Sequence, residues 1–161
     1  MNSKQDIESL LQKIAELYDA THDDMDKVLY SKIALLELCG WLEMTLDKIV
    51  LEYAEPKLTN VSNTKYLNDR VKSIYSFEYA KFRDMLIAAI GIIRVEGLEN
   101  LFELQKLRTD LGELKKKRDD FAHTTVIVGA MPNIDAPSIT INKLRNLYPI
   151  LQKLESELNE I

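Results

Sequence analysis

The residues best suited to chemistry lie together in the segment LKKKRDDFAHTT, from Leu114 to Thr125. Arg118 falls in phase with a row of apolar residues on a predicted helix: Leu107, Leu111, Leu114 and Phe121. An arginine in such a row needs a partner. Either its guanidinium reaches past the edge of the core to a carboxylate, such as Asp119 or one on a neighbouring helix, or the row faces a second subunit and the guanidinium binds phosphate.

His123 follows Arg118 by five residues, which places it about 140° around the helix and about 7.5 Å along it. Asp119, four residues before His123, shares its face and could accept a hydrogen bond from one ring nitrogen, which favours the protonated imidazole. His123 is therefore a candidate for proton transfer. The alternative is that its charge only complements the negative end of the helix.

Basic residues gather just before this pair. Six basic residues and two acidic ones lie between Gln105 and Arg118, although the whole chain has a net charge of -5. The run Lys115, Lys116 and Lys117 is either a solvated helix face or a phosphate-binding surface beside a proton-transfer group, as cleavage of an RNA phosphodiester requires.

Other chemistries lack their sequence signals. The chain has no GxGxxG, GxxxxGK[ST], HExxH, CxxC or GxSxG motif, which argues against phosphate loops, zinc hydrolases and serine hydrolases. Its two histidines, His22 and His123, are too few for a histidine-rich metal site within one chain. We therefore expect neither a metal nor another cofactor.

The elements that position these residues are predicted to be helices. A chain of 161 residues with 46% apolar residues, 5 Gly and 4 Pro indicates one all-α domain over residues 1–161, a bundle of five or six helices. Apolar periodicity and cap residues predict a first helix through residues 7–18, a second from near Asp24 or Asp26 to about 55, and a short third through residues 67–74. Further helices are predicted over about 79–94, 101–123 and 140–161. A long non-helical loop is expected over about 124–139, where a short strand could form at Val126 to Val128.

Several local features are also predicted. Asn2 or Ser3 could cap the first helix, and the second helix is apolar on two sides, as expected of a central helix. The run MLIAAIGII predicts a helix packed on every side, and Gly97 occupies a C-terminal cap position. An interruption is possible near Gln105, and a kink is expected at Pro149. The stripe from Leu144 to Ile161 is either core or an interface.

The longest apolar run has nine residues, well short of the roughly 20 that cross a bilayer, so we expect no contact with a membrane. The first residues, MNSKQDIESLLQK, lack the pattern of a secretory signal, and Cys39 is the single cysteine. Both features favour a cytoplasmic location.

The hexapeptide from Arg118 to His123 resembles the R-x4-H motif of the HEPN superfamily of helical RNases. The stretch YSKIALLELCGWLEMTLDKIV also resembles the long early helix of stand-alone HEPN proteins. The resemblance implies a metal-independent endoribonuclease of a defence, stress or toxin–antitoxin system. It also implies a homodimer in which two copies of the motif line one cleft.

Specific roles follow from this resemblance. Arg118 would hold the scissile phosphate, and His123 would move a proton to or from the 2′-hydroxyl or the leaving 5′-oxygen. Asp119, at a position where the family more often has Asn, would orient His123. Glu37 or Glu43 would supply a polar group from the early helix, and the sequence does not distinguish between them.

Two other functions are compatible with the sequence. The first is a catalytically silent HEPN-like module that binds nucleotide, RNA or a partner protein in the same cleft. The second is a plain structural dimer that uses the Leu144 to Ile161 stripe. An antitoxin or a nucleotidyltransferase is a further candidate partner.

Overall fold

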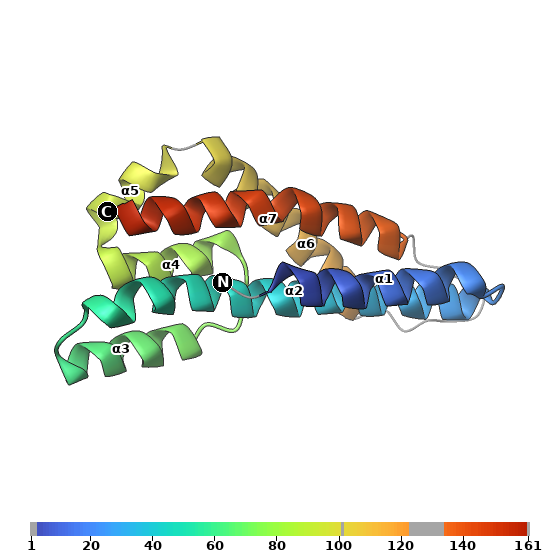
Figure 1. Cartoon of the computed structure of the whole chain (residues 1–161), viewed down its shortest axis with the longest axis horizontal. Helices are drawn as coiled ribbons and strands as arrows, with labels where there is room; N and C mark the ends of the chain where they lie inside the picture. Colours follow the sequence, from blue (N-terminus) through green and yellow to red (C-terminus); the bar gives the residue numbers. More distant parts are fainter. Residues whose placement is uncertain (1–2, 101, 123–133, 161) are drawn as a thin grey trace.

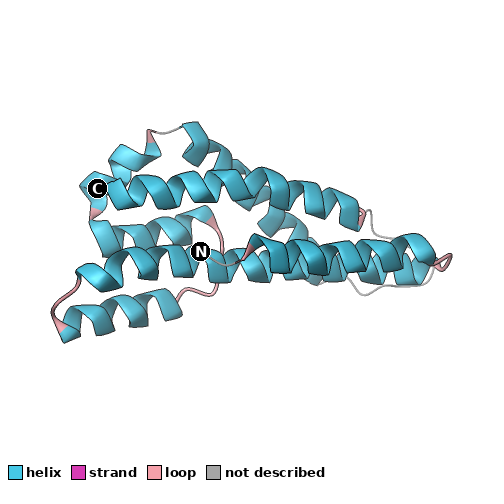
Figure 2. Ribbon diagram, viewed as in Figure 1, coloured by secondary structure: helices cyan, strands magenta, loops and turns pink. Residues whose placement is uncertain are grey.

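The computed structural model describes residues 3–100, 102–122 and 134–160, and within these ranges it contains seven α-helices, one short 3-10 helix and no strand (Figure 2). The predicted all-α class is therefore confirmed. The elements are α1 (Lys4–Ala20), α2 (Asp24–Ala54), η1 (Glu55–Lys57), α3 (Val61–Lys72), α4 (Tyr79–Ile90), α5 (Ile92–Glu99), α6 (Phe102–Ala122) and α7 (Pro137–Glu160).

Helix α2 is the central element, as its two apolar sides predicted. It packs against α1, α4, α6 and α7, and α1 runs back along it as the other arm of a hairpin (Figure 1). The buried side chains of these helices form one connected core, which includes Leu38, Leu42, Leu46, Phe82, Met85, Leu107, Leu111 and Leu151. Burial of this apolar surface is the main stabilising contribution to the bundle.

Short polar side chains begin the helices. Ser3 caps α1 by accepting a hydrogen bond from the Asp6 N–H at 3.4 Å, so one of the two predicted caps is confirmed. Asp23 caps α2 by accepting from the N–H groups of Met25 and Asp26. Such caps satisfy amide groups that have no partner inside the helix.

The first helix is fastened to its neighbours near its N-terminal end. The indole N–H of Trp41 on α2 donates to the Ser3 carbonyl at 3.3 Å, and Trp41 itself is buried. Its ring lies 6.4 Å from that of Tyr148 on α7. On the outside, Arg145 of α7 donates to Glu8 of α1 at 2.6 Å. One tryptophan therefore joins α1, α2 and α7.

The predicted continuous helix over 79–94 was wrong. Gly91 adopts a φ of 81°, a left-handed value that favours glycine, and it separates α4 from α5. The expected burial on every side was also wrong, since Ile92 and Ile93 are 57% and 83% exposed. Gly97 lies inside α5, whose C-cap is Asn100. This extra break makes seven helices where five or six were predicted.

Other boundaries also differ from the prediction. Helix α7 begins at Pro137, so the end of the predicted 124–139 loop was wrong; proline suits the first turn, where no intrahelical donor is needed. Helix α3 begins at Val61 because Asn60 caps it. Helix α6 continues through Gln105 without interruption. The possible strand at Val126 to Val128 lies outside the described residues.

The apolar stripe of α7 faces inward. Its members Leu144, Leu147, Leu151, Leu154 and Leu158 are all buried within the chain. A dimer held together by this stripe is therefore ruled out for the folded chain. None of the helices in the described ranges is long and apolar enough to span a membrane.

Candidate functional site

The candidate site lies where the last turns of α6 meet the segment that connects α3 to α4. Arg118 sits on α6, and its guanidinium carbon is 5.0 Å from the centroid of the Phe77 ring. Phe77 is fully buried, and the Arg118 side chain is 25% exposed. Arg118 therefore covers the edge of the core, which agrees with the interpretation that it reaches past the apolar row to a partner.

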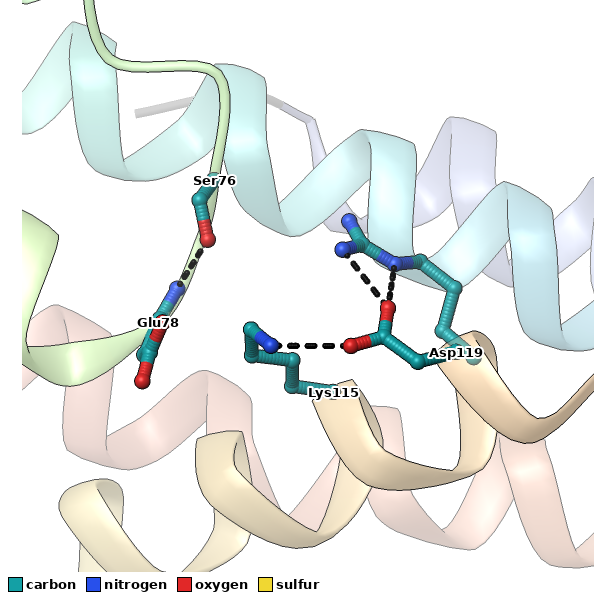
Figure 3. Close-up of polar contacts among 5 residues, drawn as sticks. Ser76, Glu78, Lys115 and Asp119 are labelled. Atoms are coloured by element: carbon teal, nitrogen blue, oxygen red, sulfur yellow. Dashed lines mark hydrogen bonds and ion pairs between the residues drawn. The ribbon is translucent and has the colours of Figure 1, made fainter. Parts of the chain in front are cut away.

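Asp119 is the carboxylate that Arg118 contacts. Its Oδ1 accepts hydrogen bonds from Nε and Nη2 of Arg118 at 3.2 and 3.0 Å. Its Oδ2 accepts from Nζ of Lys115 at 2.8 Å (Figure 3). The hydrogen bonds from Lys115 and Arg118 lower the pKa of Asp119, so this carboxylate stays charged over the whole neutral range. Both of its oxygens are thus engaged by cations.

The three predicted RNA-binding lysines do not share one surface. Lys115 joins Arg118 and Asp119, whereas Lys117 donates to Asp135 in the segment before α7. Asp135 also accepts from Lys143 of α7 at 3.2 Å, so two ammonium groups share one carboxylate. Lys116 is exposed between these two groups. The structure therefore assigns Lys115 to the side of Arg118 and Lys117 to the side of α7.

Helix α6 packs against α2, and the charge of Arg118 acts on Cys39 of that helix. Burial raises the pKa of the Cys39 thiol to about 12; the charge of Arg118 opposes this effect and that of Glu43 adds to it. A buried thiol with such a pKa is a poor nucleophile. Glu43 follows Cys39 by four residues, so both lie on one face of α2.

The structure distinguishes the two glutamates, Glu37 and Glu43, between which the sequence could not choose. Glu43 lies toward Cys39 and Arg118, whereas Glu37 lines a different groove, between α1 and α2, together with Leu10 and Met44. Glu43 is the better placed of the two to join a site around Arg118. The sequence could not distinguish them, because the choice depends on which face of α2 packs toward α6, and no local pattern encodes that contact.

Three residues near the site were not singled out by sequence reasoning. Phe77 supports Arg118, and Asp135 binds Lys117. Tyr75, two residues before Phe77, is 85% exposed and presents an aromatic side chain on the segment that carries Phe77. These contacts join parts of the chain that are distant in sequence, so no local pattern signals them. Within that segment, Ser76 accepts a hydrogen bond from the Glu78 N–H at 3.2 Å (Figure 3).

His123 lies outside the described residues, and so does its predicted contact with Asp119. Chemically, the described part of the site presents two cations, Lys115 and Arg118, around one carboxylate. Such a cluster can bind an anion through the donors that Asp119 does not use.

Among the described residues, no group of three or more His, Cys, Asp or Glu side chains could hold a metal ion. Comparison of the chain with protein-family models, curated proteins and solved structures gives no match in any of the three. The function must therefore be argued from the site itself.

Proposed function

We propose that the protein is a metal-independent endoribonuclease of the HEPN type, acting in a defence, stress or toxin–antitoxin system. The observation that supports the proposal is the position of Arg118. Its side chain is ordered by Phe77 and Asp119 at the surface of α6, beside Lys115 and five residues before His123. An ordered guanidinium loses less conformational freedom when it binds a phosphate.

In this proposal Arg118 binds the scissile phosphate. A guanidinium has five N–H donors, and two of them go to Asp119. The others would be donated to phosphate oxygens, whose charge grows in the transition state. Lys115 adds a second positive charge next to the same position. Lys116 and Lys117 would contact the backbone of the RNA further along.

His123 would transfer the proton. The 2′-hydroxyl attacks the adjacent phosphorus, the bond to the 5′-oxygen breaks, and a 2′,3′-cyclic phosphate and a 5′-hydroxyl result. His123 would accept the proton of the 2′-hydroxyl or give one to the leaving oxygen. Because the nucleophile belongs to the substrate, positioning and charge stabilisation suffice, and DNA is not a substrate.

The proposal includes a homodimer. On a helix that continues to residue 123, as the sequence predicts, Arg118 and His123 would diverge by about 140°, so in a cleft between two antiparallel copies the arginine of one chain would meet the histidine of the other. Glu43 lies on the Arg118 side of α2 and is the candidate for the polar group from the early helix. An antitoxin or a nucleotidyltransferase is a further proposed partner.

A specific observation favours a second candidate function, a catalytically silent helical module that binds nucleotide, RNA or a partner protein. Arg118 already has partners within its own chain, Phe77 and Asp119. Its place in the apolar row is therefore explained without a substrate or a second subunit. The endoribonuclease would need His123 and Arg118 for cleavage, whereas the silent module would bind its ligand and cleave no RNA.

The decisive experiment is RNA cleavage in the presence of EDTA. We expect His123→Ala and Arg118→Met each to lower the cleavage rate by about 10²- to 10⁴-fold. Arg94→Ala, which removes an exposed arginine of α5, is the matched control and should cut like the wild type. Products should end in a 2′,3′-cyclic phosphate and a 5′-hydroxyl, and mixtures of the two inactive variants should regain activity if the cleft is shared.

Two outcomes would overturn the endoribonuclease. The first is undiminished cleavage by both variants, which would point to a contaminating nuclease. The second is a wild type that binds RNA but cuts none of the RNAs supplied, which would favour the silent module. Cleavage of DNA of the same sequence would exclude chemistry through the 2′-hydroxyl.

A further inference from the structure

The hairpin of α1 and α2 carries an apolar row on its outer side. Six large apolar side chains of these two helices are at least 40% exposed: Leu10, Leu17, Met25, Leu29, Leu36 and Met44. On α2, with the half-buried Ile33 and with Gly40 between them, these positions follow one another at intervals of three or four residues. That spacing places them along one face of the helix.

This row lies on the side of α2 away from the core. The inner side contributes Leu38, Leu42 and Leu46, which are fully buried. Helix α2 is thus apolar on two sides, as predicted, but the described residues bury only one of them. Single exposed apolar residues are common in proteins, whereas a continuous row marks a contact surface.

Part of the row is hollowed into a groove between α1 and α2. The groove has a volume of about 240 Å³ and is lined by Asp6, Ile7, Leu10, Glu37, Gly40, Trp41 and Met44. At Gly40 the surface is open, because a side chain added there would meet no atom within 4 Å. The groove can therefore admit an apolar side chain from outside.

The charge of the hairpin indicates what kind of partner fits. Residues 3–54 contain eleven acidic residues and five lysines, so their net charge is -6, whereas the whole chain carries -5. Two of the acidic residues, Asp6 and Glu37, line the groove itself. The apolar row thus has an acidic border, which attracts basic groups and repels acidic ones.

We propose that the α1–α2 groove binds an amphipathic α-helix of a partner protein, whose apolar anchors are flanked by Lys and Arg. The row from Met25 to Met44 extends about 28 Å along α2, enough for a helix of roughly 18 residues. Anchors spaced by three, four and seven residues would fill it. A second copy of the same hairpin fits less well, because it would bring two charges of -6 together. This inference does not depend on the proposed catalysis.

A display selection on the full-length protein tests the proposal. The library consists of helical 18-residue peptides with fixed leucines on one face, in which the flanking positions are randomised between Lys and Glu. We expect the wild type to enrich peptides with Lys at these positions. One enriched peptide, labelled with fluorescein, should then bind in solution, and its affinity should fall as salt is added.

Matched variants locate the binding. The double variant Leu36→Gln and Met44→Gln changes two exposed side chains. It should lower the affinity for the peptide by at least about tenfold. Val61→Gln, which changes an exposed residue of α3, should leave the affinity unchanged. Glu37→Lys should lower the affinity for the Lys-flanked peptide, while the variant protein keeps its helicity. Circular dichroism of each variant shows whether the fold is retained.

Three results would overturn the proposal. Equal enrichment of Lys and Glu, or no enrichment, would show that the groove does not select a basic helix. Binding unchanged in the Leu36→Gln and Met44→Gln double variant would place the peptide elsewhere. Self-association of the wild type that this double variant abolishes would identify a second copy as the occupant.

Discussion

The guanidinium of Arg118 lies over the buried ring of Phe77, with 5.0 Å between the guanidinium carbon and the ring centroid. The positive charge that we propose to bind phosphate is therefore also part of how the chain closes its core. A cation over an aromatic ring contributes about 0.5 to 1 kcal/mol at partly exposed sites. The Arg118 side chain thus has a structural role over Phe77 and a proposed role in phosphate binding. Substitutions must be chosen so that the two roles can be measured separately.

Replacing Arg118 should thus affect stability as well as RNA cleavage. Arg118→Ala uncovers Phe77, and we expect it to lower the free energy of unfolding by about 1 kcal/mol. Arg118→Met keeps an unbranched side chain over the ring and should cost less, although both variants lose the charge. Urea unfolding followed by circular dichroism measures the difference. Equal stability of both variants and the wild type would show that the contact with Phe77 contributes nothing.

The carboxylate of Asp119 competes with any anion for Arg118. Asp119→Asn removes the negative charge between Lys115 and Arg118, and we expect RNA to bind more tightly, with a steeper dependence on salt. Fluorescence anisotropy with a labelled single-stranded RNA measures both quantities.

Asp120→Asn is the matched control, because it changes the net charge of the chain by the same amount at the next residue. If both variants strengthen binding equally, the effect comes from net charge alone. If Asp119→Asn weakens binding, the main role of the carboxylate is to position Arg118.

Asp47 should make the folded chain less stable as the pH rises. Burial, with a contribution from Glu43, raises the pKa of Asp47 from 3.8 to about 6. Between these values the folded chain holds a proton that the unfolded chain releases, so stability falls with pH across this window and stays low above it. Asp47→Asn should stabilise the protein at pH 8 by on the order of 1 to 2 kcal/mol and have little effect at pH 4. Thermal unfolding at the two pH values tests this, and a pH-independent gain would contradict it.

Replacing Gly40 or Gly91 with alanine should change the stability of the chain in opposite directions. Gly40 lies inside α2 with open space around it, so Gly40→Ala should stabilise the chain by about 0.5 to 1 kcal/mol through helix propensity. Gly91→Ala meets no clash but must adopt a φ of 81° with a ψ of 157°, a region almost exclusive to glycine, which costs about 1 to 3 kcal/mol. Urea midpoints compare them directly. A loss of stability in Gly40→Ala would mean that the groove is closed in solution.

The parts of the fold that follow from local signals were predictable. Ser3 caps α1 and α2 begins at Asp24, because short polar side chains bind the free amides of the next turn. The choice between Gly91 and Gly97 as the helix end was not predictable in this way. Either glycine can end a helix, and only the packing of the neighbouring helices decides which one takes the positive φ.

The candidate site was predictable only along α6. Arg118, Asp119 and Lys115 are local to one helix, and their mutual contacts follow from its geometry. The contacts of Arg118 with Phe77 and of Lys117 with Asp135 bring distant segments together, and no periodicity encodes them. The same reason explains why the sequence could not choose between Glu37 and Glu43.

The hydrogen bond from Trp41 to Ser3 turns the only tryptophan of the chain into an optical reporter. Its indole lies at the joint of α1, α2 and α7 and also lines the groove, on the opposite side of α2 from Cys39 and Arg118. A helix that enters the groove should shift its fluorescence emission, whereas RNA held at Arg118 should leave the wavelength unchanged. One spectrum can therefore tell which face of α2 is occupied.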